Sequence, residues 1–252
     1  MINLKLYLML SLVFLSLISN SQNLVPNSSF EEYISLPSET NEIQKCKYWY
    51  SPRGLSPDYF HAEATTPTYN YTAPVVSVPD NIFGYQKAKS GNAYVGITTF
   101  DSEHYTFREM IAVKLIKKLK KDSIYKVSFY ISLSEDNIYF HNYFGVNIGK
   151  DSLSKVKTRN GYGKVIAPNS ITIKVNTTIA KDTTDWHLVQ TIYLAKGGEQ
   201  YLWIGLTKKN INRIRFWITK LFHKTGWGGD HSAYYYIDDV TVVKIKEESA
   251  EY

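Results

Sequence analysis

The sequence predicts an all-β protein in which two antiparallel sheets, joined by long loops, pack as a β-sandwich. Four segments are rich in β-branched and aromatic residues, and several alternate apolar with polar positions as half-buried strands do: 93–97, 125–131, 187–194 and 201–205. Turn-forming residues stand between such segments at 89–92, 120–123 and 196–199. A two-sheet sandwich is the natural way for these strands to bury their apolar faces.

The first 22 residues have the layout of a secretory signal peptide. Lys5 precedes a continuous apolar run at 6–18, and small and polar residues follow at 19–22. The run is too short to cross a bilayer as a helix, so we expect cleavage near Ser21 or Gln22 rather than a retained anchor. No later segment is apolar enough for a membrane-spanning helix, and the sequence therefore predicts an exported protein.

The rest of the chain predicts one domain, residues 23–246, followed by a polar tail at 247–252. No linker rich in Pro, Gly or Ser and no internal repeat divides it. Cys46 is the only cysteine, which excludes an internal disulfide. The 29 Lys and Arg residues exceed the 23 Asp and Glu residues by a formal charge of +6, which is too little to indicate nucleic-acid binding.

Two segments are ambiguous. Residues 109–121 could suit a helix, but Ile111, Val113 and Leu115 alternate with other residues, and we expect a strand that runs into a basic turn. Residues 212–224 mix basic with apolar and aromatic residues. They could form an amphipathic helix on a membrane surface, or the hairpin or capping element that we favour.

Acidic residues stand at the edges of apolar segments near both ends of the chain. Glu31 follows Phe30 in the N-terminal motif at 27–31, and Asp238 and Asp239 close the motif at 234–240. This arrangement suggests that the first and last strands lie side by side. A hard cation bound by carboxylates of both motifs would hold the two ends of the chain together.

Several motifs resemble one family, the galactose-binding-like jelly-roll domain, which is related to carbohydrate-binding modules. The motifs stand in family order: NLVPNSSFEE at 23–32, SPDYFH at 56–61, VPDNIFGYQ at 78–86, SGNAYVGI at 90–97 and YYYIDDV at 234–240. The family occurs in exported and outer-membrane proteins of Bacteroidetes, often before an OmpA-like domain. The resemblance implies a jelly-roll fold and says little about the ligand, because the fold hosts many functions.

The chain also departs from the family. Leu36 and Glu63 stand where members often carry cysteines, which leaves Cys46 as an expected buried thiol. The sequence ends soon after the last strand, without an OmpA-like or sorting domain. The basic stretch at 208–224 does not match the shorter and more acidic loop of the family, so novelty in partner choice is expected there.

The resemblance implies a structural calcium site beside the first and last strands. Its ligands would be Glu31, one of Asp238 and Asp239, and backbone oxygens near residues 90–92. The alternative is that these carboxylates only accept hydrogen bonds from loop amides. Neighbouring strand residues face opposite sides, so Asp238 and Asp239 cannot both reach one small site without a bulge.

Aromatic residues in polar, turn-rich segments are the candidate ligand platforms, although most of the 21 Tyr residues are expected to be core or sheet-face residues. The candidates are Trp49, Tyr50, Tyr59, Phe60 and Tyr85. Polar residues beside them could hydrogen-bond sugar hydroxyls: Asp58, His61, Gln86, Arg108 and Glu109. For Arg108 and Glu109 a structural ion pair is an equal alternative. Trp217 and Trp227 form a second, less specific cluster.

Catalysis finds little support in the sequence. Asp151 to Leu153 resemble an esterase block but lack its strand-turn-helix context, and zinc-protease, phosphate-loop and nucleophile-elbow motifs are absent from the sequence. We therefore expect an exported, non-catalytic binding module for a glycan or another cell-envelope component, in the periplasm, at the outer-membrane surface or outside the cell. The alternative is an outer-envelope assembly protein that docks a protein or lipid partner through residues 208–224.

Overall fold

The computed structural model describes residues 22–51, 55–65, 75–101, 108–137, 139–152, 170–205, 217–218 and 232–245. Residues 1–21 of the expected signal peptide and the polar tail at 247–252 lie outside the described residues. The basic stretch at 208–224 also lies outside them, apart from Trp217 and Ile218.

One antiparallel sheet has five strands in the order β11-β7-β14-β5-β2. Its strands are β2 (Asp58–His61), β5 (Ala93–Asp101), β7 (Ile124–Leu133), β11 (His187–Leu194) and β14 (Ser232–Lys244). The strand predicted at 187–194 has the predicted bounds, and those predicted at 93–97 and 125–131 extend further. Strand β14 lies at the centre, so the last strand of the chain organises this sheet.

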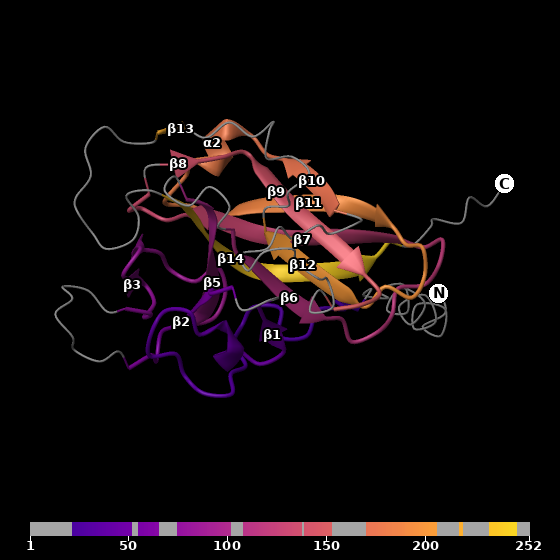
Figure 1. Cartoon of the computed structure of the whole chain (residues 1–252), viewed down its shortest axis with the longest axis horizontal. Coiled ribbons are helices and arrows are strands. Elements are labelled where there is room, and N and C mark those ends of the chain that lie inside the picture. Colours follow the sequence, from indigo (N-terminus) through magenta and orange to yellow (C-terminus); the bar gives the residue numbers. More distant parts are fainter. Residues whose placement is uncertain are drawn as a thin grey trace, which may run out of the picture.

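The other five-stranded sheet has the order β1-β6-β12-β9-β10 and is also antiparallel. Its strands are β1 (Trp49–Tyr50), β6 (Met110–Lys114), β9 (Tyr143–Gly149), β10 (Ser170–Lys174) and β12 (Tyr201–Gly205). Strand β6 confirms that residues 109–121 begin as a strand and not as a helix. In Figure 1, β6, β12 and β9 cross in front of β7 and β14.

Short elements complete the described chain. They are the two-stranded pairs β3 (Asp80–Asn81) with β4 (Gly84–Tyr85) and β8 (Tyr139–Phe140) with β13 (Trp217–Ile218), the 3₁₀ turn η1 (Ile43–Lys45) and the helix α2 (Thr177–Ala180). No helix among the described residues is long and apolar enough to cross a membrane. The predicted all-β, two-sheet antiparallel sandwich of jelly-roll type is confirmed.

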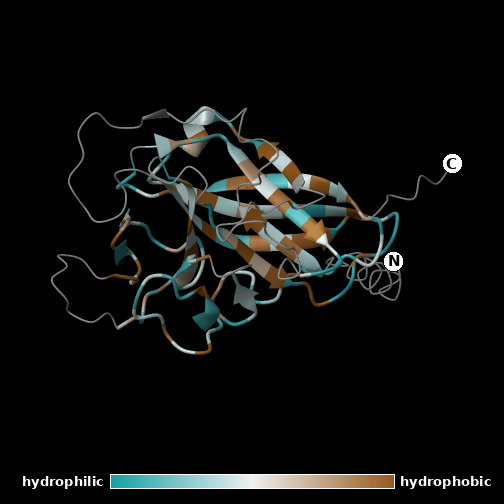
Figure 2. Ribbon diagram, viewed as in Figure 1, coloured by the Kyte–Doolittle hydropathy of each residue, from teal (hydrophilic) through white to brown (hydrophobic). Residues whose placement is uncertain are grey.

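The main core lies between the two sheets. Inward-facing residues such as Phe129 and Val127 of β7 meet Val146, Ile148 and Leu202 of the opposite sheet, and all belong to one buried cluster. Hydrophobic and hydrophilic residues alternate along β7 and β11, as Figure 2 shows. The period of two places one apolar row against the core and leaves the other row outside.

Strand β14 is buried on both faces. Tyr235 and Ile237 lie in the core between the sheets, whereas Tyr234 and Tyr236 pack with Phe60 in a second buried cluster outside the sheet. Each tyrosine hydroxyl finds a partner: Tyr234 donates to Asp58, Tyr235 to the carbonyls of His141 and Ala180, and Tyr236 to Asn81. A buried hydroxyl without a partner would cost about 1 to 3 kcal/mol, so these hydrogen bonds determine which segments pack against β14.

The N-terminal segment lies beside β14, as the sequence suggests, but it is not a strand. The Leu24 amide donates to the Val242 carbonyl at 2.8 Å, and the Val240 amide donates to the Ser28 carbonyl at 2.8 Å. Residues 26–29 form a turn, and Asn27 and Phe30 have positive φ values of 47° and 65°. The prediction of a first strand at 27–31 is therefore wrong, because left-handed residues cannot continue an extended ladder.

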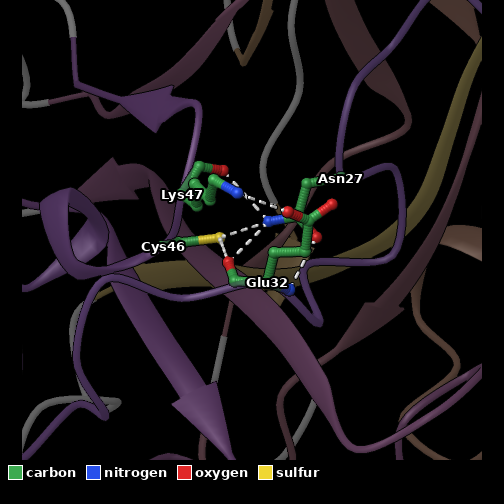
Figure 3. Close-up of polar contacts among 4 residues, drawn as sticks. All are labelled: Asn27, Glu32, Cys46 and Lys47. Atoms are coloured by element: carbon green, nitrogen blue, oxygen red, sulfur yellow. Dashed lines mark hydrogen bonds and ion pairs between the residues drawn. The ribbon is translucent and has the colours of Figure 1, made fainter.

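Asn27 connects this turn to the segment before β1, as Figure 3 shows. Its amide group donates to the carbonyls of Glu32 (2.7 Å) and Lys47 (3.0 Å) and to Cys46 Sγ (3.4 Å), and its oxygen accepts from the Glu32 amide. Cys46 is a free, buried thiol, as expected, and burial raises its pKa far above the usual range. Asparagine fits here because it tolerates the left-handed backbone and supplies both donors and an acceptor.

Replacing Asn27 tests this junction. We expect Asn27→Ala to lower the free energy of unfolding by about 2 to 4 kcal/mol, because several hydrogen bonds are lost and alanine disfavours the left-handed backbone. Asn27→Gly is the matched control, because it keeps the backbone conformation and loses only the side-chain bonds. Urea unfolding measures both variants, and equal stability of Asn27→Ala and the wild type would contradict the assignment.

Candidate functional site

Most of the aromatic residues that the sequence singled out are core residues. Trp49 is 3% exposed, and Tyr59 and Phe60 have no exposed surface. The Trp49 indole donates to the Asn27 carbonyl, and the Tyr59 hydroxyl donates to the Phe30 carbonyl. The expectation that these three form platforms in exposed loops is wrong, because they lie in β1 and β2 with side chains turned into the buried clusters.

The polar residues expected beside them are also buried, and several already have protein partners. Asp58 accepts from the Asn41 amide and the Tyr234 hydroxyl, and Glu109 accepts from Ser56 and from the Thr98 amide.

The same holds for the remaining polar candidates. His61 Nδ1 accepts from the Glu63 amide, and the Gln86 amide group donates to Ser132. Arg108 is 9% exposed, with its guanidinium 5.8 Å from the Phe100 ring. As an exposed sugar-binding surface, the predicted group of Asp58, His61, Gln86, Arg108 and Glu109 is not formed.

Two predicted aromatic residues remain accessible. Tyr85, in the separate β3–β4 hairpin, is 44% exposed. Tyr50 is half-buried at the start of the second sheet. Of the less specific cluster, Trp227 lies outside the described residues, and Trp217 is placed only as a backbone partner of Phe140.

Asp58 and Glu109 form a buried acidic pair. Burial raises the pKa of Asp58 to about 8, the neighbouring Glu109 adds to this, and the hydrogen bonds from Tyr234 and Asn41 oppose it. Burial likewise raises the pKa of Glu109, against the hydrogen bonds from Thr98 and Ser56. Because both side chains are enclosed by protein donors, this pair belongs to the fold and not to an accessible site.

The carboxylates nominated for calcium meet backbone amides. Glu31 accepts from the amides of Asn92 and Ala93 at 3.0 to 3.1 Å, and Asp238 accepts from those of Lys89 and Ser90 at 2.9 and 3.2 Å. This is the alternative that the sequence left open.

A β-bulge brings Asp238 and Asp239 to the same turn. The pairing of β14 with β7 shifts register between Asp238 and Thr241, and Asp239 has a φ of 49°. Ser90 donates its amide to Asp238 and its hydroxyl to Asp239. Among the described residues no group of three His, Cys, Asp or Glu could hold a metal ion. Calcium binding itself is not tested by these contacts and stays a prediction.

A different group of side chains lies on the outward side of the second sheet, which we call the aromatic face. Its members are Tyr50, Met110, Ala112, Asn147, Tyr201 and Trp203. Strand pairing aligns Tyr50 with Ala112, Ala112 with Trp203, and Trp203 with Asn147, so one row crosses four strands. Met110, Ala112 and Trp203 form a buried cluster separate from the main core, with Tyr50 and Tyr201 packed against it.

Three polar groups in this row lack well-formed hydrogen bonds. Tyr50 Oη, Trp203 Nε1 and Asn147 Nδ2 are buried and have no well-formed hydrogen bond within the part of the chain that the structure describes, although the Trp203 side chain lies close enough to Tyr50 to act on its pKa as a hydrogen-bond partner. Burial, with a contribution from Tyr201, raises the pKa of Tyr50 to about 12, and hydrogen bonding with the side chain of Trp203 opposes the rise. Each unpartnered group costs about 1 to 3 kcal/mol, which a bound ligand could recover.

Two aromatic rings of this face are stacked against each other. The rings of Tyr201 and Trp203 are stacked, with centroids 6.2 Å apart and planes within 17°. Gly149 lies directly beside Trp203, since a Cβ there would come within 2.8 Å of the indole ring. Glycine at this position is therefore required for the indole to lie against β9.

Sequence reasoning found Tyr50 but missed Asn147, Tyr201 and Trp203. The segment at 201–205 was recognised only as a strand. The available signal is that Tyr201 and Trp203 are two residues apart and hence share one strand face, while Leu202 and Ile204 supply the core face. The lack of a well-formed acceptor for the side-chain donors of Asn147 and Trp203 is visible only when the strands are paired.

No family model matches the chain, and no curated protein matches it. Solved structures resemble it distantly. The xylan-binding domain CBM22-1 of Paenibacillus barcinonensis Xyn10C is 16% identical, with 90% of this chain and 97% of that chain covered and a TM-score of 0.41.

Two further structures resemble the chain to a similar degree. TmCBM61, in complex with β-1,4-galactotriose, is 12% identical over 89% of this chain and 100% of that chain, with a TM-score of 0.35. The K3 cleaved adhesin domain of Lys-gingipain from Porphyromonas gingivalis is 11% identical, with 88% of this chain and 98% of that chain covered and a TM-score of 0.39. Each likeness is distant and is one of fold alone.

The buried acidic pair predicts a pH-dependent stability. An exposed aspartate in the unfolded chain titrates near pH 4, whereas Asp58 in the folded protein titrates near pH 8. Between these values the unfolded chain loses a proton that the folded protein keeps, so the stabilisation present below about pH 4 is lost as the pH rises towards 8. We expect Asp58→Asn to reduce the fall in melting temperature between pH 5 and pH 8.

Calorimetry of Asp58→Asn at several pH values measures this effect. In Asp58→Asn the fall in melting temperature with rising pH should be smaller than in the wild type but still present, because burial also raises the pKa of Asp238 to about 8. Asp80→Asn, at an exposed position in β3, is the control and should keep the wild-type slope. An unchanged slope in Asp58→Asn would contradict the assignment.

Removal of divalent cations tests the calcium prediction. If calcium is bound as the sequence predicts, a chelator lowers the melting temperature; if the carboxylates of Glu31 and Asp238 only accept backbone N–H groups, the melting temperature stays unchanged. A fall in melting temperature that added calcium reverses would show that the native state binds the ion, since a ligand of the native state stabilises it.

Proposed function

We propose that this protein is a non-catalytic glycan-binding module and that the aromatic face is its binding surface. The observation that carries the proposal is the pair of half-buried rings, Tyr50 and Tyr201, at the edge of this group, beside the buried Asn147 amide, whose Nδ2 has no partner among the described residues. Trp203 and Asn147 themselves are each 2% exposed. A sugar ring presents apolar C–H groups on its faces and oxygens around its rim. Such a ligand would pack on the rings and supply the missing acceptors.

The aromatic face is not the group of aromatic loop residues that the sequence predicted as the binding site. Side chains on paired strands are held more firmly than side chains on loops, so the donors of β9 and β12 are preorganised for a ligand. Export of the module, and with it a cell-envelope or extracellular glycan as the target, remains a prediction of the leader sequence.

Substitution of Trp203 tests the binding surface. We expect Trp203→Ala to weaken glycan binding about tenfold or more, because loss of a central aromatic anchor typically removes well over 1 kcal/mol. Asn147→Leu keeps the side-chain volume, removes the amide donor and should also weaken binding. Tyr85→Ala, in the β3–β4 hairpin, is the matched control and should bind as the wild type does.

Isothermal titration of the purified proteins with soluble xylan, galactan and polygalacturonate measures these changes. Circular dichroism and the melting temperature establish that each variant is folded. Binding that survives both Trp203→Ala and Asn147→Leu, or that Tyr85→Ala abolishes, would place the site elsewhere. Failure of the wild-type protein to bind any of the glycans would argue against the function.

A further inference from the structure

Aliphatic side chains are exposed at one corner of the sheet that contains β11, β7 and β14. The ends of β11 and β14 meet the start of β7 there, because Leu194 pairs with Ile124 and the Ile245 amide donates to the Ile124 carbonyl. Alternate residues of these strands lie in the core, so one outward row across the three strands consists of Leu194, Ile124 and Ile245. The next row consists of Ile192, Lys126 and Val243.

Several aliphatic residues of this corner are open to solvent. Leu194 is 62% exposed, Ile192 56% and Ile245 38%. Ile116 is 44% exposed and belongs to the same corner, because its amide donates to the Leu24 carbonyl and Leu24 in turn is hydrogen-bonded to β14. A single exposed aliphatic residue is ordinary, whereas a contiguous group on adjacent strands marks an interaction surface.

Lysines surround these aliphatic residues. The segment between β6 and β7 lies beside the turn between β11 and β12, since the Leu119 amide donates to the Glu199 carbonyl and the Asp122 amide to the Ala195 carbonyl. The exposed lysines that these segments and the end of β14 bring together are Lys117, Lys118, Lys120, Lys121, Lys196 and Lys244. Lys126 stands among the aliphatic residues themselves. We call the exposed aliphatic residues and these lysines the basic corner.

Carboxylates balance little of this charge among the described residues of these segments. The Asp122 carboxylate lies 3.9 Å from Lys121 Nζ, and both side chains are largely exposed. Glu199 is buried and accepts from the Tyr193 hydroxyl and the Lys196 amide. The tail at 247–252 adds three glutamates to the sequence and lies outside the described residues. The described surface of the basic corner therefore combines a cluster of positive charge with exposed aliphatic side chains.

A bilayer that contains anionic lipids fits both features. Its negative surface attracts nearby lysines, and its headgroup region takes up aliphatic side chains to a depth of about 5 to 10 Å. A nucleic acid or an acidic polysaccharide would also attract the lysines, but it offers leucine and isoleucine side chains little apolar surface to bury against. The aliphatic residues among the lysines therefore favour a lipid surface over an anionic polymer.

We propose that the basic corner docks on the surface of an anionic phospholipid bilayer. Leu194, Ile192 and Ile245 enter the headgroup region, and the surrounding lysines lie against lipid phosphates. The aromatic face is on the outward side of the other sheet, so the two surfaces are separate. The inference therefore goes beyond the glycan-binding function and adds attachment to a membrane surface.

Sedimentation with lipid vesicles tests the proposal on the chain without its leader, residues 23–252, because the apolar run at 6–18 would itself bind lipid. Vesicles of phosphatidylcholine alone are compared with vesicles of equal parts phosphatidylcholine and phosphatidylglycerol. We expect partitioning to the anionic vesicles to be about tenfold or more stronger at low salt, because each lysine near the surface contributes about a fivefold increase. Part of the binding should persist at high salt, since salt does not screen aliphatic burial.

Lysine variants test the charged part of the contact. The double variant Lys117→Gln with Lys118→Gln should weaken binding to anionic vesicles about tenfold. The matched control is Lys87→Gln with Lys181→Gln, because these lysines are exposed and lie near the start of β11, at the opposite end of the strand from Leu194. Equal losses in the two double variants would indicate non-specific charge attraction and overturn the proposal.

Aliphatic variants test insertion into the lipid. Leu194→Ser should weaken binding about threefold or more, at low and at high salt, because the lost contact is apolar. Leu188→Ser is the matched control, since Leu188 is 44% exposed on the same strand face and lies roughly 20 Å from Leu194 along β11. The control should bind as the wild type does, and an equal loss in Leu188→Ser would argue against docking by this corner. The melting temperature establishes that each variant is folded.

Other occupants give different results. Binding that high salt abolishes and Leu194→Ser leaves unchanged would indicate a polyanion site, and so would tighter binding of DNA than of vesicles. Self-association in ultracentrifugation that Leu194→Ser abolishes would make a second copy the occupant. Loss of vesicle binding when residues 247–252 are deleted would move the contact to the tail. Each of these results, like the absence of vesicle binding, overturns the lipid proposal and leaves the glycan-binding function to be decided by glycan titration.

Discussion

The burial of β14 on both faces is the constraint on which the rest of the structure depends. A strand covered on both sides leaves its polar side-chain atoms no water, so each tyrosine hydroxyl must find a protein partner. Tyr234 holds Asp58 of β2, Tyr235 holds the chain at His141 and at the end of α2, and Tyr236 holds Asn81 of the β3–β4 hairpin. Four segments far apart in the sequence are thereby placed around one strand.

On the aromatic face, unlike on β14, buried polar atoms of the side chains lack well-formed hydrogen bonds. In β14 every buried tyrosine hydroxyl is satisfied, whereas on the outward side of the second sheet Tyr50, Trp203 and Asn147 keep buried polar atoms without a partner among the described residues. Because all three tyrosine hydroxyls of the central strand have protein partners, a buried polar atom without a partner is unusual in this structure. Ser51 Oγ and Glu199 Oε2 are also buried without a partner, but only Tyr50, Trp203 and Asn147 lie in one row across β1, β12 and β9, and this row is where we place the ligand.

The ends of the chain stabilise the fold without forming an open site. Glu31 holds the start of β5 and Asp238 holds the turn before it, so the N-terminal segment and β14 meet around residues 89–93. The bulge that turns Asp239 towards Ser90 makes both acidic side chains part of this junction. The same contacts explain how a domain with one buried cysteine and no internal disulfide joins its first and last segments.

The sequence by itself determined the long strands, the turns between them, the antiparallel sandwich and the meeting of the two acidic motifs, but not the turn at residues 26–29, where it predicted a strand. These follow from local preferences, since alternation and turn residues act within a few positions. Only the tertiary structure decided which strand face is covered. Tyr59 and Trp203 both lie in strands and both are buried, yet Tyr59 donates to the Phe30 carbonyl in the core between the sheets, and Trp203 belongs to a separate buried cluster on the other side of its sheet. The difference depends on which distant segments pack against each strand, and alternation along one strand carries no information about that.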